Sequence, residues 1–258
     1  MQLAEERRQA IVEAVEREGR VLAVELARSL DTSEDTIRRD LRDLDAAGLL
    51  RRVHGGAVRL RREASFSERA EADMARKGQL AQGLRECIRP GDTVLIDAGS
   101  THLALARQLE DGCAAAIVTN SPQIAMALGH FRRTRIVLLG GTYHPDAGAT
   151  VGAATLLEVQ RLRADLALVG VCGLDPARGL AAANPEEAAL KAAMLAGSAR
   201  RVVAVLNERL EDGAAFVFGA LADLDHLVLE ADASPEAVQR LRSANPALDI
   251  KFSGKAKA

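Results

Sequence analysis

From about residue 76 onward, short apolar runs alternate with helical patterns, and this alternation leaves few folds open to the chain. Several of the apolar runs are continuous, which is typical of strands buried on both faces. The sequence therefore predicts an α/β fold built on a doubly wound, mostly parallel sheet. The expected strands are 93–96, 115–119, 135–139, 165–169, 202–206, 227–230 and 248–252. The expected helices are about 76–88, 101–110, 122–130, 153–162, 185–199 and 235–243.

Small polar residues follow four of these expected strands. The four turns are Asp97-Ala98-Gly99-Ser100-Thr101, Thr119-Asn120-Ser121, Gly140-Gly141-Thr142 and Gly170-Val171-Cys172-Gly173. Ligands of doubly wound sheets bind beyond the carboxyl ends of the strands, where glycines let a backbone approach closely and hydroxyls donate hydrogen bonds. Glycine and serine also serve as plain turn residues. Four such turns at one sheet edge nevertheless favour a polar pocket, with phosphate as the expected ligand.

The N-terminal part of the chain contains a local basic patch. Residues 36–62 carry eight arginines against three aspartates, a net charge of +5, although the whole chain carries −2. Such a patch indicates a nucleic-acid contact, the alternative being a solvated charged face. Aromatic residues make up only 2% of the chain, so a base-stacking platform for single strands or RNA is disfavoured. Double-stranded DNA is the expected partner.

Three helical patterns occupy the N-terminal region, at about 4–18, 22–30 and 34–47. Ser33 is the expected N-cap of the third helix, in which Ile37, Leu41 and Leu44 form one buried face. The helical wheel places three arginines on the side opposite this face, where a phosphate backbone or the major-groove edge of guanine could be contacted. Ser33 and Thr36 lie in the first turn, where recognition helices usually touch bases. The three arginines are Arg38, Arg39 and Arg42.

Two short extended runs follow, 49–53 and 57–60, around a glycine turn. Three helices and a basic hairpin predict a winged helix-turn-helix over residues 1–60, with the helix-turn-helix at about 21–40. Arg52 and His54 are the expected wing contacts. The alternative is a small helical docking domain that is rich in arginine. Residues 61–75 are polar and patternless and are interpreted as a linker to an α/β domain over 76–258.

The chain lacks the motifs of common catalytic and cofactor sites. It contains no G-x-S-x-G, H-E-x-x-H, Walker A or G-x-G-x-x-G string. Its five histidines show no ligand spacing, and its three cysteines form no C-x-x-C pair. We therefore expect no catalytic residue, no metal and no cofactor. The charged N-terminus and the short apolar runs argue against a signal peptide and a membrane span, so a cytoplasmic location is expected.

The N-terminal region resembles the DNA-binding domain of the DeoR family of bacterial transcriptional regulators. The strings that carry the resemblance are Val24-Glu25-Leu26-Ala27, Thr36-Ile37-Arg38-Arg39-Asp40-Leu41 after Ser33, Asp43-Leu44, and His54-Gly55-Gly56-Ala57 after Arg52. A helix-turn-helix pattern by itself would be weak support. The Thr-Ile-Arg-Arg-Asp-Leu string with a downstream His-Gly-Gly-Ala is highly specific.

Residues from about 77 to 232 resemble the DeoR-type sensor domain, which is similar in fold to ribose-5-phosphate isomerase. The matching strings begin at Asp97, Val118 and Leu139, and continue with Gly179, Asn184-x-Glu186-Glu187 and Lys191. Family members typically sense phosphorylated sugars or related intermediates, and the effector releases the operator. The resemblance implies an effector site formed by Asp97, Gly99, Ser100, Thr101, Asn120, Gly140, Gly141 and Lys191.

Two departures from the family pattern bear on the effector. The usual Asp-x-Ser-Lys is replaced by Glu208-Arg209-Leu210-Glu211, so an acid takes the place of the lysine, and His102 replaces a threonine. The effector could therefore be a molecule other than a phosphorylated sugar, or a less charged one.

The resemblance implies a metabolite-responsive repressor of a carbohydrate operon. We expect it to bind DNA as a dimer or tetramer, because one winged helix offers a small contact area. The alternative is a sugar-phosphate isomerase-like enzyme with a docking domain. It would need a carboxylate base such as Asp97 or Glu187 together with a cation, and the chain lacks the lysine–glycine loop of the isomerases.

Overall fold

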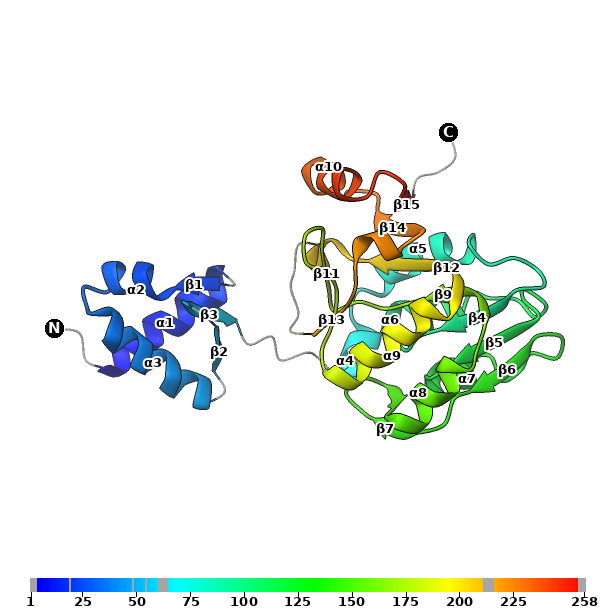
Figure 1. The fold of residues 1–258 in the computed structure, drawn as a ribbon, viewed down its shortest axis with the longest axis horizontal. Coiled ribbons are helices and arrows are strands. Elements are labelled where there is room, and N and C mark those ends of the chain that lie inside the picture. Colours follow the sequence, from blue (N-terminus) through cyan, green and yellow to red (C-terminus); the bar gives the residue numbers. More distant parts are fainter. Residues whose placement is uncertain are drawn as a thin grey trace. The chain divides into compact units, whose positions relative to one another are not determined.

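The computed structural model describes residues 4–18, 20–47, 49–53, 55–59, 65–210 and 216–254. The chain divides into two compact units, residues 1–62 and 63–258, each of which is described by itself (Figure 1). None of the helices in the described ranges is long and apolar enough to cross a bilayer.

The first unit is a winged helix-turn-helix, as the sequence predicts. Its core combines one face of each helix with the sheet, through residues such as Ile11, Leu26, Ile37 and Leu50. The strands form an antiparallel sheet in the order β1-β3-β2. The elements are α1 (Ala4–Glu18), β1 (Arg20–Leu22), α2 (Ala23–Ser29), α3 (Glu34–Ala46), β2 (Leu50–Val53) and β3 (Gly56–Arg59).

Strand β1 is absent from the sequence-based prediction, which assigns Leu22 to the second helix. Three residues are too few for a period-2 pattern, and β1 exists because it pairs with β3 far along the chain. The close approach explains a glycine of the wing. A Cβ at Gly56 would collide with the carbonyl oxygen of Val21, so the pairing of these strands requires glycine at this position.

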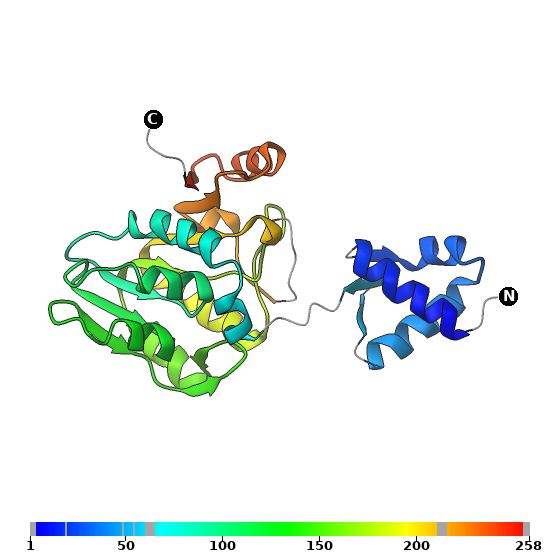
Figure 2. The same cartoon turned by 180° about the vertical axis from the view of Figure 1, so that it is seen from behind.

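The second unit is built on a seven-stranded parallel sheet with the order β15-β14-β12-β9-β4-β5-β6 (Figures 1 and 2). Each expected strand is present, and these seven strands make up the whole sheet, which confirms the predicted doubly wound α/β fold. The strands are β4 (Thr93–Ile96), β5 (Ala116–Thr119), β6 (Arg135–Leu138), β9 (Ala164–Leu168), β12 (Ser198–Val205), β14 (His226–Glu230) and β15 (Asp249–Ser253).

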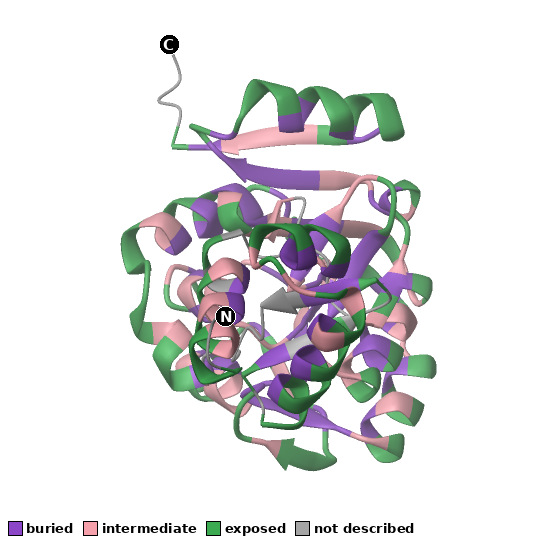
Figure 3. Cartoon of the chain, turned by 90° about the vertical axis from the view of Figure 1, so that its left-hand side faces the viewer, coloured by how far each residue is buried: buried purple, intermediate pink, exposed green. Residues whose placement is uncertain are grey.

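Two hydrophobic clusters cover the two faces of this sheet. Val94 and Ile96 belong to one cluster, and Leu95 between them belongs to the other, because successive side chains of a strand point to opposite faces. Helices α5, α6 and α7 cover the first face, and α8, α9 and α10 the second, each with its buried side inward (Figure 3). They are α5 (Met74–Arg85), α6 (Ser100–Ala106), α7 (Pro122–Ala127), α8 (Ala153–Gln160), α9 (Pro185–Ala196) and α10 (Pro235–Ala244).

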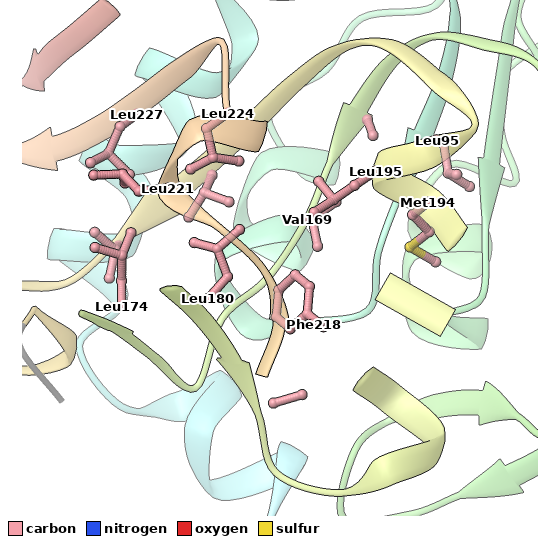
Figure 4. Close-up of a cluster of buried hydrophobic side chains, with 14 of the residues drawn as sticks. Leu95, Val169, Leu174, Leu180, Met194, Leu195, Phe218, Leu221, Leu224 and Leu227 are labelled. Atoms are coloured by element: carbon pink, nitrogen blue, oxygen red, sulfur yellow. The ribbon is translucent and has the colours of Figure 1, made fainter. Parts of the chain in front are cut away.

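Two small antiparallel sheets were not predicted. Strands β7 (Thr142–His144) and β8 (Ala149–Val151) form a hairpin after β6. Strands β10 (Gly173–Asp175), β11 (Gly179–Ala182) and β13 (Phe216–Gly219) form the other sheet. Leu174, Leu180 and Phe218 of this sheet belong to one core cluster with Met194 and Leu195 of α9 (Figure 4).

The structure corrects the predicted linker of residues 61–75. Residues Phe66–Glu71 form helix α4, and α5 already begins at Met74. Phe66 is buried in the core cluster of the second unit. The polar composition of the segment hid this helix, because one buried ring and a capping Ser65 give no helical periodicity.

Candidate nucleic-acid interface and effector site

Helix α3 presents the predicted arginine face to solvent. Ser33 is its N-cap, and the Ser33 hydroxyl accepts a hydrogen bond from the Thr36 backbone N–H at 3.2 Å. Ile37, Leu41 and Leu44 are buried, as expected. Arg38, Arg39 and Arg42 are all exposed.

The three arginines differ in their partners. Arg38 forms ion pairs with two acids of the same helix, Glu34 at 2.7 Å and Asp35 at 3.4 Å. Within the described ranges, Arg39 and Arg42 form no ion pair. The guanidinium groups of Arg39 and Arg42 can therefore bind an external anion without breaking an ion pair within the protein.

Asp40, between the arginines in sequence, anchors α3 to α1. Its carboxylate is 2% exposed and accepts hydrogen bonds from Arg7 Nε at 2.6 Å and Arg8 Nε at 3.1 Å. The hydrogen bond to Asp40 raises the pKa of Arg7, and Arg8 also pairs with Asp43. On the helical wheel Asp40 falls on one flank of the helix, and the wheel cannot show that α1 lies against that flank.

The predicted wing contacts are placed only in part. Arg52 lies on β2 with its side chain exposed, and its backbone N–H donates to Asp45 of α3 at 3.2 Å. This hydrogen bond fixes the start of the wing against the end of α3. His54 lies outside the described residues.

The candidate effector residues lie near the point where the strand order of the large sheet reverses, between β4 and β9. Asp97 follows β4, and its Oδ2 accepts a hydrogen bond from the Gly170 N–H at 2.9 Å and pairs with the Lys191 ammonium. Lys191, from α9, also donates to the Gly170 carbonyl at 3.0 Å. Burial opposes the charge of Lys191, but Asp97, Glu187 and Cys172 together favour it, so the pKa of Lys191 is raised.

Asn120 joins two more segments to this edge of the sheet. Its Oδ1 accepts a hydrogen bond from the Ala98 N–H at 2.8 Å, and its Nδ2 donates to the Thr150 carbonyl of β8 at 3.3 Å. The Thr150 N–H returns a hydrogen bond to the Asn120 carbonyl at 2.7 Å. Asn120 is 1% exposed, so it holds the loop after β4 against the β7–β8 hairpin.

Gly99, Ser100 and Thr101 border this network and remain half-buried at the start of α6. His102 follows them and is fully enclosed. Its Nδ1–H donates to the Asp97 carbonyl at 2.7 Å, and burial lowers the pKa of His102. The neutral imidazole therefore stabilises the backbone of the loop after β4.

Gly140 and Gly141 stand apart from the Asp97 network. Both are exposed after β6 and lie beside α8, with Gly141 also close to the Val151 carbonyl of β8. The Gly140 carbonyl accepts a hydrogen bond from Thr155 at 2.6 Å, and a Cβ at Gly141 would collide with the Thr155 hydroxyl. The positive φ of Gly141, +135°, adds a backbone reason for glycine.

Sequence reasoning missed Thr150 and left Gly170 out of the predicted site. Gly170 had a signal, because it follows an apolar strand, whereas Thr150 had none. The segment that replaces the usual Asp-x-Ser-Lys of the family is described only in part. Glu208 pairs with Arg76 at 2.7 Å, and Arg209 donates to the Cys172 carbonyl at 2.9 Å. Glu211 lies outside the described residues.

Comparison with known proteins agrees with this two-unit architecture. The DeoR-like helix-turn-helix domain matches residues 7–63, and the DeoR C terminal sensor domain matches residues 72–231. The HTH-type transcriptional regulator GlpR of Haloferax volcanii is 31% identical over 246 residues, 94% of this chain and 96% of that protein. The glycerol-3-phosphate regulon repressor of Escherichia coli is 28% identical over 247 residues, 95% of this chain and 98% of that protein.

Among solved structures, a ribose 5-phosphate isomerase A of Methanocaldococcus jannaschii aligns with a TM-score of 0.39 at 14% identity, covering 54% of this chain and 55% of that one. A winged helix-turn-helix with an exposed arginine face, joined to an α/β unit with a polar strand edge, defines a DNA-binding transcriptional regulator and not an enzyme. The chain belongs to the DeoR family.

Proposed function

We propose that the protein represses a carbohydrate-metabolism operon and that a phosphorylated sugar or a related metabolite relieves the repression. The arginine face of α3 carries the first half of this proposal. Arg39 and Arg42 are exposed and form no ion pair within the described ranges, so they can contact bases and phosphates of the major groove. Ser33, Thr36 and Arg38 in the first turns, with Arg52 and His54 of the wing, complete the proposed DNA contacts. DNA binding would place the protein in the cytoplasm.

The strand-end site supports the second half. In doubly wound sheets, ligands bind at the carboxyl ends of the strands where the strand order reverses. Gly99, Ser100 and Thr101 lie there with two hydroxyls and half-buried backbone, over the network of Asp97, Asn120 and Lys191. We assign Gly99–Thr101 to direct contact with the effector. We assign the Asp97 and Lys191 pair to holding that loop in place.

Gly140 and Gly141 form the outer border of the proposed effector site. They lie two strands from β4, so a ligand that reached both loops would span the ends of β4, β5 and β6. A phosphorylated sugar is an extended molecule with a charged end and several hydroxyls, which suits such a spread of small polar groups. The relatives include a glycerol-3-phosphate regulon repressor, and glycerol 3-phosphate is therefore the first compound to test.

We further propose that the protein binds DNA as a dimer or tetramer. A single winged helix covers few base pairs, and specific affinity is usually reached by pairing half-sites. The second unit is the better source of the interface, because the first is small and highly charged. Light scattering of the free protein and of its DNA complex tests this, and a monomer in both would contradict it.

The test of DNA recognition is capture of sheared genomic DNA by the purified protein, followed by sequencing. Sharp enrichment of fragments upstream of a carbohydrate operon is the expected result. Uniform recovery that disappears with added salt would mean phosphate contact alone, and would overturn the repressor proposal.

The effector is tested on the enriched fragment. Glycerol 3-phosphate is titrated into the complex, with glycerol as the matched compound that lacks the phosphate. Release by the phosphorylated compound alone is the expected result. If it fails, other sugar phosphates suggested by the genes beside the fragment follow. Retention of the complex with every phosphorylated compound would contradict the effector assignment and leave DNA recognition standing.

A further inference from the structure

Helix α4 is the first described element of the second unit. Only residues 60–64, which lie outside the described residues, separate Arg59 of β3 from Ser65, the N-cap of α4. A change in the second unit that travels along the chain toward the first unit must therefore pass through α4.

Helix α4 depends on its surroundings for its existence. It has six residues, and helices of this length are unstable alone in water. A capping box supports its start: the Ser65 N–H donates to Glu68 at 2.6 Å, and the Glu68 N–H donates to the Ser65 hydroxyl at 3.3 Å. Capping contributes about 1 kcal/mol, too little to hold so short a helix without packing.

Helix α4 packs into a site on the second unit that is here called its seat. The turn of the β7–β8 hairpin forms one side of this site. The Phe66 ring is 4% exposed and lies against Gly148, where a Cβ would collide with the ring. Gly148 has a φ of +66°, so both its backbone and its neighbour require glycine. In addition, Arg69 Nη2 donates to the Asp146 carbonyl of the same turn at 3.0 Å.

A buried cation holds the other end of α4. Lys77 of α5 is 5% exposed, and its ammonium donates to the Ala72 carbonyl at 2.7 Å and to the Arg69 carbonyl. Arg69 lies in the last turn of α4 and Ala72 is its C-cap, so their carbonyls are among those that a helix end leaves without a partner in the helix. Burial lowers the pKa of Lys77, so the contact is made against a desolvation cost.

The neighbours of α4 are the elements that carry the proposed effector residues. Helix α6, which begins at Ser100, packs on α4, and Leu103 shares a core cluster with Phe66. The β7–β8 hairpin carries Thr150, which is bonded to Asn120. A ligand bound at these loops would thus act on both sides of the seat.

We propose that α4 is the element through which effector occupancy regulates operator binding. The seated helix is the operator-binding form, and the effector shifts the protein toward a form in which α4 leaves its seat. The inference rests on the proposed function for the position of the effector site. Such a shift requires only that the effector binds the unseated form better, and coupling of this kind typically changes affinity about 5- to 150-fold.

The test needs no effector. In the full chain, Phe66→Ala removes the buried ring and Gly148→Ala drives it out, so both variants should unseat α4. Two controls match them. Phe131→Ala removes an equally buried ring from the same core cluster, away from α4. Gly91→Ala adds a Cβ at a similar positive φ, +92°, where the structure has open space.

Two quantities are measured well below the unfolding temperature of each variant: amide hydrogen exchange in residues 66–72, and affinity for the enriched operator fragment. We expect faster exchange and operator affinity reduced about tenfold or more for Phe66→Ala and Gly148→Ala, within the usual range of allosteric coupling. We expect neither change for the two controls.

The inference is overturned if exchange rises and affinity stays at the value of the controls. It is equally overturned if exchange in α4 does not rise, because the seat would then not depend on Phe66 and Gly148. The proposed function fails separately, when the unchanged protein shows no specific fragment or no release by a sugar phosphate. Where release occurs, the releasing compound should also speed exchange in residues 66–72 of the unchanged protein.

Discussion

The carboxylate of Asp97 and the ammonium of Lys191 form an ion pair at the point where the strand order of the large sheet reverses. The two side chains come from positions 94 residues apart and are only 2% and 4% exposed. Each charge is compensated inside the protein, so Lys191 is not a free cation waiting for an anionic ligand. An effector phosphate that contacted Lys191 would have to compete with Asp97.

Replacing Lys191 with Met should strongly destabilise the second unit. Asp97 would keep its hydrogen bond from Gly170 but would remain buried without its cation, which typically costs about 3–5 kcal/mol. The free energy of unfolding can be followed by tyrosine fluorescence during urea unfolding. Tyr143 is the only tyrosine and the chain has no tryptophan, so this signal reports the second unit alone.

The matched variant is Asp97→Asn combined with Lys191→Met, which removes both charges. We expect the double variant to be more stable than the sum of the single effects, by a coupling of about 1–3 kcal/mol. Additive losses would mean that the two groups do not stabilise each other, and would contradict the ion pair as the link between β4 and α9.

His102 should make the stability of the second unit depend on pH. Burial favours the neutral imidazole and lowers the pKa of His102 in the folded protein. The unfolded chain binds a proton near pH 6.5, so the contribution is fully present above that pH and is lost as pH falls below it. The slope approaches about 1.4 kcal/mol per pH unit.

The measurement is the urea midpoint of the Tyr143 signal between about pH 8 and 5.5. His102→Gln should flatten the loss at low pH, because the variant has no imidazole to charge. His130→Gln, at an exposed histidine, should leave the slope of the unchanged protein intact. An equal slope in all three proteins would show that another group carries the pH dependence.

The large sheet could be predicted because its strands are buried on both faces and read as continuous apolar runs. Residues 93–96 were placed without error, whereas β12 begins four residues before its expected start at 202, because Ser198, Arg200 and Arg201 interrupt the apolar pattern. Elements that depend on distant partners gave no signal. Strand β13 pairs with β11, which lies more than thirty residues earlier. Helix α4 is stabilised by Gly148, which is far along the chain, and by Lys77, which lies on α5.

The candidate site divides along the same physical line. Turns at strand ends indicate which residues gather at one edge, and Asp97 and Asn120 do so. Hydrogen bonds between distant segments were beyond the sequence. Nothing local marks Thr150 as the partner of Asn120, or Arg7 as the partner of Asp40. The sequence pattern therefore predicts which residues lie at the end of each strand, and only the folded structure shows which of them contact one another.

Asp40→Asn should weaken the first unit and lower operator affinity together. The amide keeps the size of the carboxylate but loses its charge and one of its two acceptor oxygens, so Arg7 and Arg8 cannot both keep their hydrogen bonds to this side chain. Hydrogen bonds to charged groups contribute about 1.5–3 kcal/mol, and the loss should fall in this range. Helical circular dichroism reports the helices of both units, and the Tyr143 signal reports the second unit alone. We therefore expect the part of the dichroism change that does not follow the Tyr143 transition, which belongs to α1–α3, to shift in the variant, and the Tyr143 transition not to move.

The same variant distinguishes support from contact at the DNA interface. Asp40 is buried, so it acts on DNA only through the placement of α3. We expect its effect on operator affinity to shrink at lower temperature, where the first unit is folded in both proteins. A temperature-independent loss of affinity would contradict a purely positioning role.

Two arginines of α3 should affect DNA binding in different ways. If Arg39 pairs bidentately with a guanine, Arg39→Ala should cost about 1–3 kcal/mol of operator affinity and relax specificity at one base pair. If Arg42 contacts the backbone, Arg42→Ala should weaken binding to all sequences alike and reduce the slope of log affinity against log salt by about one unit. Titrations of operator and scrambled fragments at several salt concentrations separate the two effects. Arg28→Ala, at an exposed arginine of α2, is the matched control.

Arg38 provides the sharpest comparison, because its charge is already balanced by Glu34 and Asp35. Removing it should change the salt slope less than removing Arg42, since fewer counterions are released where a carboxylate competes with phosphate. Glu34→Gln frees part of that charge and should increase affinity for operator and scrambled DNA alike. Equal salt slopes for Arg38→Ala and Arg42→Ala would mean that the internal ion pairs of α3 are broken in the complex.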